Sequence, residues 1–400
     1  MLTTISRYNF SKRFGGMAIN FTRALLPLTL KRGIVSKMGC IDETCNVEKL
    51  AHSADTKEIQ VNGYSGLFDF THQKEFRIYG KQRYNFIDYL TTGSFNKYNL
   101  CNYSLMLNGC GKIISDVIVL YQDNHISLIN NGINNKQVEN YLNQEIRESH
   151  KLGCSPNDLT ISNSDSKIYY LYGSNSYNIL KSVLEEIKYN EFSIKHFTYL
   201  QDLECINIFD DMFDVDIIKY PMRRNLGYKI IIKSDNSKDF CGLILNQDGT
   251  YQESLETYNV LCHDNFIVKY PDEINLKINP LEANLYNCLP CKNDYKFTQR
   301  NFKGADMLIE KGTYRYPKKI ICGLRGLHMV NNDVIIPNRD MVIYDTQSNI
   351  IGTITSSCLR PRDNTIMAMG YIDLDKLDGN INNMVYIGNL PYILHAFPPV

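Results

Sequence analysis

The chain has 400 residues, of which 43 are basic and 43 are acidic, and 44% of its residues are hydrophobic. This length exceeds what one compact core needs, so we expect two or three domains. The balanced charge excludes the basic excess that is typical of a general nucleic-acid binder. No run of about 18 apolar residues occurs, so we expect neither a transmembrane helix nor a membrane partner.

The first 40 residues contain basic side chains but no acidic ones. This composition is typical of a mitochondrial transit peptide, and it predicts localisation in the mitochondrial matrix. Pro27 interrupts the apolar run Ala24–Leu30, which disfavours a secretory signal. The alternative is a basic tail without a targeting role. Residues 41–60 are acidic and polar without a clear period, and we expect them to form a linker.

The folded part begins with elements whose patterns are local. Glycines punctuate Gly63–Asp69, which indicates a loop, and Glu75–Tyr79 has the composition of a strand. Within Arg83–Leu90, the apolar side chains recur at nearly helical spacing, and the pattern stops at Gly93. The sequence therefore predicts a strand followed by a helix.

The next stretch, Leu105–Leu120, reads LMLNGCGKIISDVIVL and predicts a hairpin whose second strand is buried. That strand carries a single carboxylate, Asp116. Because strand side chains alternate, we expect Asp116 to share a face with Ile114 and Ile118, where an unpaired charge is costly. A structural explanation is a hydrogen bond to the backbone or a buried arginine. The functional explanation is a catalytic or ligand-orienting carboxylate.

The same alternation of strands and helices continues downstream, with short turns that favour α+β layers of the split βαβ kind over a doubly wound sheet. No GxGxxG motif follows a strand, so a fused flavin domain is not supported. The predicted strands are His125–Asn130, Lys167–Tyr172, Glu204–Ile208 and Tyr228–Ile232, and the predicted helices are Gln137–Ile146 and Tyr177–Ile187.

From Lys318 onward the helical patterns disappear and short strands dominate, which predicts a small β-barrel. The expected strands are Lys318–Gly323, Val334–Ile336, Met341–Tyr344, Ile350–Ile354 and Ile366–Tyr371.

Several blocks resemble, in order and spacing, those of the glycine-cleavage T-protein, the aminomethyltransferase. The resemblance covers about residues 60 to 397, with weaker stretches between the blocks. The blocks are Gly66–His72 (GLFDFTH), Glu75–Gly80 leading into Lys81–Gly93 (KQRYNFIDYLTTG), Tyr103–Val119, Asn279–Leu285 (NPLEANL), Phe302–Lys311 (FKGADMLIEK) and Ile351–Ile372 (IGTITSSCLRPRDNTIMAMGYI).

This resemblance implies an α+β fold with two folate-binding α+β subdomains and a C-terminal β-barrel in a cloverleaf arrangement. We expect the folate-binding part to span residues 61–300 and the barrel to span residues 301–400. The implied reaction transfers an aminomethyl group from the lipoyl arm of the H-protein to tetrahydrofolate. Tetrahydrofolate would be the co-substrate, lipoylated H-protein the partner, and the chain a monomer.

The resemblance also implies site residues. The family usually shows two successive acids where this chain has Ser115-Asp116, and we assign the catalytic role to Asp116. Tyr103 and Asn131 fall on positions that line the folate pocket in the family. Their structural alternatives are a core tyrosine and an ordinary turn residue.

Three departures from the family pattern concern the ligand contacts. The pterin-reading glutamate of the GYTGE motif is replaced by Asn225, and the first arginine of the RDSLRLE helix by His263. The final aromatic tyrosine is replaced by Phe397. An amide recovers only part of the hydrogen bonding of a carboxylate, so these positions predict a weakened folate site.

The twelve cysteines show no disulfide framework, and we expect reduced thiols and no metal site. Cys288–Cys291 and Cys40–Cys45 have the closest spacing, but two pairs so far apart make a poor zinc site. Two other functions remain open: a subunit that has lost catalysis, and a folate-fold protein that assists iron–sulfur cluster assembly. The second class shows a KGCYxGQE motif, and the corresponding stretch Thr298–Ala305 has no such cysteine.

Overall fold

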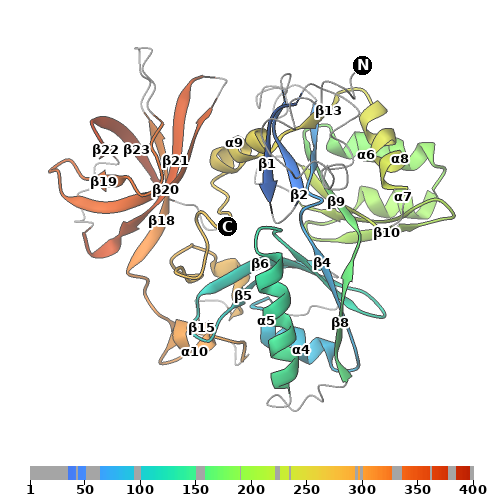
Figure 1. The fold of residues 1–400 in the computed structure, drawn as a ribbon, viewed down its shortest axis with the longest axis horizontal. Helices are drawn as coiled ribbons and strands as arrows, with labels where there is room; N and C mark the ends of the chain where they lie inside the picture. The colour runs from blue at the N-terminus through green and yellow to red at the C-terminus, as the bar shows by residue number, and fades with distance from the viewer. Residues whose placement is uncertain are drawn as a thin grey trace, which may run out of the picture.

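The computed structural model shows two α+β lobes and a β-barrel, with the barrel on one side and the two lobes on the other (Figure 1). This agrees with the α+β class and the C-terminal barrel that the sequence predicts. The structure describes residues 35–41, 44–50, 64–93, 101–149, 158–189, 191–220, 226–233, 236–292, 296–297, 301–326, 336–360, 363–376 and 384–396.

The first lobe is a five-stranded antiparallel sheet in the order β5-β6-β7-β4-β8. Two helices, α4 and α5, cover one face, and their apolar side chains form a single core with those of the sheet. The elements are β4 (Glu75–Tyr79), α4 (Arg83–Leu90), β5 (Cys101–Leu107), β6 (Ile113–Tyr121), β7 (Ile126–Asn130), α5 (Asn135–Glu148) and β8 (Thr160–Ser164).

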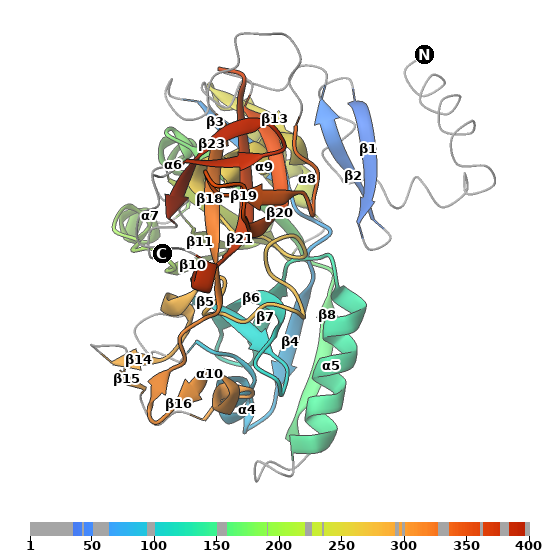
Figure 2. The same ribbon diagram turned by 90° about the vertical axis from the view of Figure 1, so that its left-hand side faces the viewer.

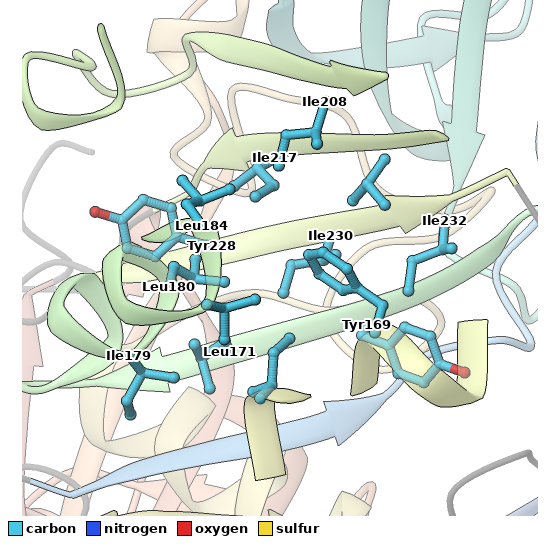
Figure 3. Close-up of a cluster of buried hydrophobic side chains, with 14 of the residues drawn as sticks. Tyr169, Leu171, Ile179, Leu180, Leu184, Ile208, Ile217, Tyr228, Ile230 and Ile232 are labelled. Atoms are coloured by element: carbon cyan, nitrogen blue, oxygen red, sulfur yellow. The ribbon is translucent and has the colours of Figure 1, made fainter. Parts of the chain in front are cut away.

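The second lobe is a six-stranded sheet in the order β10-β11-β12-β9-β3-β13, in which only the β3–β13 pair is parallel. Helices α6, α7 and α8 cover its outer face, and Figure 3 shows side chains of α6 packed on strand residues such as Ile230 and Leu171. The elements are β3 (Ser65–Asp69), β9 (Lys167–Gly173), α6 (Ser176–Glu186), α7 (Glu191–Thr198), β10 (Cys205–Phe209), β11 (Asp214–Lys219), β12 (Gly227–Ile232), α8 (Ser237–Asn246) and β13 (Thr250–Glu253).

The two sheets contact each other through their remaining faces. Ile118 and Leu120 of β6 are buried in one cluster with Tyr170 of β9 and Ile231 of β12. Helix α9 (Leu255–Asn265) contributes Leu261 to the same cluster. Because both sheets are covered on both faces, their central strands are almost wholly buried, which agrees with their β-branched and aromatic composition.

The segment after α9 runs back between the first lobe and the barrel. Leu281 and Phe302 pack there against Leu105 of β5 and Met369 of the barrel. This segment includes a 3₁₀ turn, a short helix and a small sheet ordered β14-β15-β17-β16. Its elements are η3 (Tyr286–Cys288), β14 (Cys291–Lys292), β15 (Lys296–Phe297), α10 (Ala305–Leu308), β16 (Ile309–Glu310) and β17 (Thr313–Tyr314).

The closed barrel has the strand order β18-β21-β20-β19-β22-β23. Arg360 at the end of β20 forms a buried ion pair with Asp264 of α9 at 2.6 Å, which fixes the barrel to the second lobe. The barrel strands begin at Lys319, later than the expected boundary at residue 301. The strands are β18 (Lys319–Gly326), β19 (Val342–Tyr344), β20 (Ile350–Arg360), β21 (Thr365–Asp373), β22 (Met384–Ile387) and β23 (Leu390–Ala396), and η4 (Leu374–Lys376) follows β21.

The N-terminal part differs from the expected linker. Strands β1 (Val35–Ile41) and β2 (Thr44–Leu50) pair with each other, and they lie beside the second lobe in Figure 2. Residues 1–34 lie outside the described part of the chain, so the transit peptide stays a prediction. Within the described residues, no helix is long and apolar enough to cross a membrane.

Candidate active site

A cavity of about 540 Å³ lies where the two lobes and the segment after α9 meet. This volume lies within the range of small-molecule sites, which is roughly 300–1,000 Å³. The β3–β4 turn contributes Phe70, His72 and Gln73 to its lining. The first lobe adds Tyr103, Asp116 and Asn131, and the second lobe and α9 add Tyr220, Tyr258 and Asn259.

Asp116 stands on β6 with its carboxylate at this cavity. Its Oδ1 accepts a hydrogen bond of 2.9 Å from the side-chain amide of Asn131, and its Oδ2 accepts one of 3.3 Å from the hydroxyl of Tyr103. The fold therefore brings together Tyr103, Asp116 and Asn131, the three first-lobe residues that were predicted for the site. Two donors fix the carboxylate orientation while part of it remains open to the cavity.

A β-bulge decides which face of β6 carries Asp116. Leu105 pairs with Asp116 and Leu107 pairs with Ile113, so Ile114 is the extra residue on β6. Ile114 packs with the outer core under α4 and α5, whereas Ile118 lies between the lobes. The expectation that Asp116 shares a face with Ile114 was wrong, because the bulge interrupts the alternation. The expectation for Ile118 is confirmed.

Ser115 has a separate structural role. Its hydroxyl donates to Asn130 Oδ1 at 2.5 Å and accepts a bond from the Asn131 amide at 3.0 Å. Asn130 in turn bonds Asn135 at the start of α5. Ser115 is fully buried and does not line the cavity. It supports the loop that carries Asn131, and only the second residue of the Ser115-Asp116 pair faces the cavity.

Aromatic rings make up much of the cavity wall. The rings of Phe70 and Tyr258 pack edge to face with centroids 4.8 Å apart, and the ring centroids of Tyr103 and Tyr220 are 6.5 Å apart. Burial, followed by the charge of Asp116, raises the pKa of both Tyr103 and Tyr220, so these phenols stay neutral. The cavity thus offers flat apolar surfaces beside the Asp116 carboxylate, which suits a planar heterocycle.

Burial lowers the pKa values of two further groups beside this wall, His72 and Lys229. Burial, assisted by the charge of Lys229, lowers the pKa of His72 to about 3, so the imidazole is neutral. Burial also lowers the pKa of Lys229 to about 8, although the charge of Asp116 opposes the shift. Lys229 on β12 donates to Gln73 Oε1 at 2.9 Å and lies 5.4 Å from the ring centre of Tyr220.

Comparisons with known proteins identify the family of the chain. The model of the family described as the GCVT N-terminal domain matches residues 15–292, which is more than half of the chain. The chain belongs to the T-protein family. Because the match starts at residue 15, it overlaps the segment that the sequence assigned to a presequence.

Similar proteins are named aminomethyltransferases. The aminomethyltransferase of Alkaliphilus metalliredigens is 26% identical over 319 residues, which cover 78% of this chain and 79% of that protein. The aminomethyltransferase of Thermoanaerobacter pseudethanolicus is 22% identical over 381 residues, or 92% and 88% of the two chains. The glycine cleavage system aminomethyltransferase T of Bartonella henselae has the same fold, with a TM-score of 0.74, 20% identity and coverage of 94% and 98%.

In this T-protein family member, His263 does not line the cavity. Its Nδ1 bonds the Asn259 carbonyl at 2.8 Å and its Nε2 bonds Ser356 of β20 at 2.9 Å. Burial lowers its pKa to about 4. His263 was expected among the ligand contacts, but it lies one helical turn beyond Asn259, where the barrel packs on α9. It is a junction residue between α9 and the barrel.

Other predicted positions cannot be placed in the cavity. Asn225 and Phe397 lie outside the described residues, and so do the side chains of Cys40, Cys45 and Cys291. Cys288 is described, and burial, followed by the charge of Asp116, raises the pKa of its thiol to about 12. No group of three potential metal ligands gathers in the part of the chain that the structure describes.

Some cavity residues have no signal in the sequence. Lys269 lines the cavity and donates to Asn259 Oδ1 at 2.6 Å, and Gln73 bonds Lys229 across 156 residues of chain. Neither contact follows from a local pattern. The one available signal was Lys229 itself, a charged residue in the apolar run Tyr228–Ile232.

Proposed function

We propose that this protein is an aminomethyltransferase of the glycine cleavage system. It would transfer the aminomethyl carbon from the lipoyl arm of the H-protein to tetrahydrofolate, with release of ammonia, and form 5,10-methylenetetrahydrofolate. The substrate pair comes from the family, and the chain's own cavity supports it. We further propose that the protein acts as a monomer.

One observation carries this proposal. The Asp116 carboxylate faces a cavity walled by aromatic rings, and Asn131 and Tyr103 hold it from two sides at 2.9 and 3.3 Å. A reduced pterin has a flat ring for such walls and ring nitrogens whose protons a carboxylate can accept. A fixed base and a fixed ligand reduce the entropy that the reaction must lose.

The proposed chemistry balances with the groups at hand. The methylene carbon forms two carbon–nitrogen bonds, to N5 and N10 of the folate. Its bonds to the lipoyl sulfur and to the amino nitrogen, which leaves as ammonia, break. The two folate N–H protons end on the lipoyl sulfur and on the leaving ammonia. Asp116 would take a folate proton and stabilise the cationic carbon, an effect worth about 10²–10⁴-fold as a general base. The neutral phenols Tyr103 and Tyr220 would keep water from the ring.

A reconstituted assay tests the function. The purified protein should release ammonia and form 5,10-methylenetetrahydrofolate only when both tetrahydrofolate and aminomethylated H-protein are present. Folate binding without turnover would favour a subunit that has lost catalysis. A lack of binding together with impaired iron–sulfur enzymes on depletion would favour the cluster-assembly function.

We also propose that residues 1 to about 40 direct the chain to mitochondria, on the basis of their basic, acid-free composition. The relatives named above are bacterial and do not bear on this proposal. A fluorescent reporter fused behind residues 1–40 should enter mitochondria. Cytosolic fluorescence would count against both the targeting role and the proposed compartment.

A further inference from the structure

Gln73, which is half-buried, and the buried Lys229 form a polar pair at the cavity that the proposed mechanism does not use. The Lys229 ammonium donates to Gln73 Oε1 at 2.9 Å, and Lys229 is 8% exposed. Gln73 lines the cavity, while Lys229 lies behind it on β12. Burying a lysine without a full salt bridge is costly, so the arrangement calls for an explanation.

The lysine fixes the orientation of the glutamine amide. An ammonium group has three donors and no acceptor, so only the oxygen of Gln73 can face it. The amide nitrogen, with its two donors, must then point the other way. Within the described residues, no protein acceptor takes a hydrogen bond from this nitrogen. Gln73 therefore presents a donor at the cavity.

This donor lies on the same side of the cavity as Asp116. Gly132 follows Asn131, and a Cβ at Gly132 would come within 2.8 Å of the His72 carbonyl oxygen and 3.0 Å of the Gln73 backbone nitrogen. The turn that carries Asn131 is thus in close contact with the turn that carries Gln73. One stretch of wall therefore combines an acceptor, the Asp116 carboxylate, with a donor, the Gln73 amide.

We propose that Gln73, oriented by Lys229, is a specificity-determining residue that donates a hydrogen bond to a carbonyl oxygen on the ring of the bound ligand. The inference rests on the proposed function, because the ring in question is that of a reduced pterin. A pterin with an oxo group at position 4 has such an acceptor. Its 4-amino counterpart has a donor there instead, which would face the Gln73 donor without a partner.

The charges around Lys229 keep this orientation at neutral pH. Asp116 is the acidic group that favours the ammonium form, whereas the buried Cys101 thiol and the Tyr220 phenol stay neutral because burial raises their pKa values. His72 is also neutral. With a pKa of about 8, Lys229 is mostly protonated below that pH and can only donate.

The test compares two ligands that differ only at position 4 of the ring. Tetrahydrofolate and tetrahydroaminopterin would be titrated under argon into the full-length protein by calorimetry. The wild type should bind the 4-oxo compound roughly 10- to 100-fold more tightly, which is the penalty for a mismatched donor that the bound ligand covers. Gln73→Met should bring the two affinities within a few-fold of each other, and Gln73→Glu should reverse the preference because a carboxylate only accepts.

Lys229 variants test the orienting role. Lys229→Arg keeps the donors and should keep the preference, whereas Lys229→Met should lose it as Gln73→Met does. An unchanged preference in Gln73→Met, with both ligands still bound, would overturn this inference and leave the proposed function standing. Failure of the wild type to bind either ligand would overturn both.

Discussion

Two carboxylates of the first sheet, Glu75 on β4 and Asp116 on β6, occupy opposite kinds of environment. Glu75 is 1% exposed and accepts bonds from Arg77 at 3.0 and 3.1 Å, from Ser127 at 2.5 Å and from Ser166 at 2.7 Å. Among the described residues, Asp116 accepts hydrogen bonds only from Asn131 and Tyr103, one on each carboxylate oxygen, and its remaining acceptor capacity faces the cavity.

The difference separates a structural acid from a functional candidate. Burial raises the pKa of Glu75, but its hydrogen bonds and the charge of Arg77 outweigh this effect and lower the pKa to about 2. All of its acceptor capacity is used within the fold. Asp116 has only half of its capacity used by protein, so a ligand proton can still reach it. Burial alone would have selected the wrong acid.

The largest expected effect is on activity, from Asp116→Asn. The amide keeps the shape but cannot accept a proton, so ammonia release should fall by about 10²–10⁴-fold. The melting temperature should stay close to that of the wild type, because one side of Asp116 faces the cavity. Full activity with intact folate binding would remove Asp116 from the mechanism.

The reverse result is expected for Glu75→Gln. Its amide nitrogen turns two donors toward Arg77 and one of the two serines, so the free energy of unfolding should fall by on the order of 3 kcal/mol, measured in urea. Activity per folded molecule should not change. Loss of activity without loss of stability would contradict the division between the two acids.

The pH dependence provides a second readout for Glu75. Its folded pKa, about 2, is lower than its ordinary value of 4.5. Its contribution to stability is therefore fully present above pH 4.5 and is lost as the pH falls from 4.5 toward 2. The Glu75→Gln variant should lack this component of acid unfolding, and identical acid-unfolding slopes in the two proteins would argue against it.

A smaller effect is expected at the junction between α9 and the barrel. His263→Ala removes the two side-chain hydrogen bonds of His263, to the Ser356 hydroxyl and the Asn259 carbonyl, while Ser356 keeps its bond to Glu273, so unfolding should become easier by about 1–3 kcal/mol. Tetrahydrofolate affinity should change less than about twofold, which is less than the loss of one hydrogen bond to the ligand would cause. Ser356→Ala is the matched control, and a large affinity loss in His263→Ala alone would restore His263 as a ligand contact.

The smallest expected effect concerns Asn225. If this position reads the pterin edge, Asn225→Glu should tighten tetrahydrofolate binding by about 1–2 kcal/mol, because a neutral hydrogen bond becomes charge-assisted. An ion pair with the neighbouring Arg223 or Arg224 would compete with this contact, but ion pairs that water screens contribute little. Calorimetry that shows no tightening while Asp116 remains essential would mean that other residues read the pterin.

The sequence predicted elements whose signal is local. Glu75–Tyr79 and Arg83–Leu90 were predicted with their observed bounds, because alternation and helical spacing are complete within each segment. Gly63–Asp69 was interpreted as a loop from its glycines, yet Ser65–Asp69 within it is a strand, because β9 and β13 pair with it on both sides. Pairing with strands that are distant in the chain cannot be recognised from the few residues of the segment itself.

The same distinction holds for the site. Asp116 was predicted because a lone acid in an apolar strand is visible in the sequence, and Tyr103 and Asn131 followed from the family pattern. Gln73 was not predicted. A polar residue in a turn carries no functional signal in the sequence, and its contact with Lys229 is seen only in the structure. His263 was assigned to the ligand contacts, but it contacts the barrel. The position of the barrel decides which turn of α9 lines the cavity, and the sequence does not show that position.

An anaerobic calorimetric titration with tetrahydrofolate tests the account most directly. The wild type should bind one folate per chain in the cavity beside Asp116, and Asp116→Asn should still bind while it no longer releases ammonia. Glu75→Gln, studied below its melting temperature, should bind and turn over like the wild type. Absence of binding by the folded wild-type protein would contradict the account.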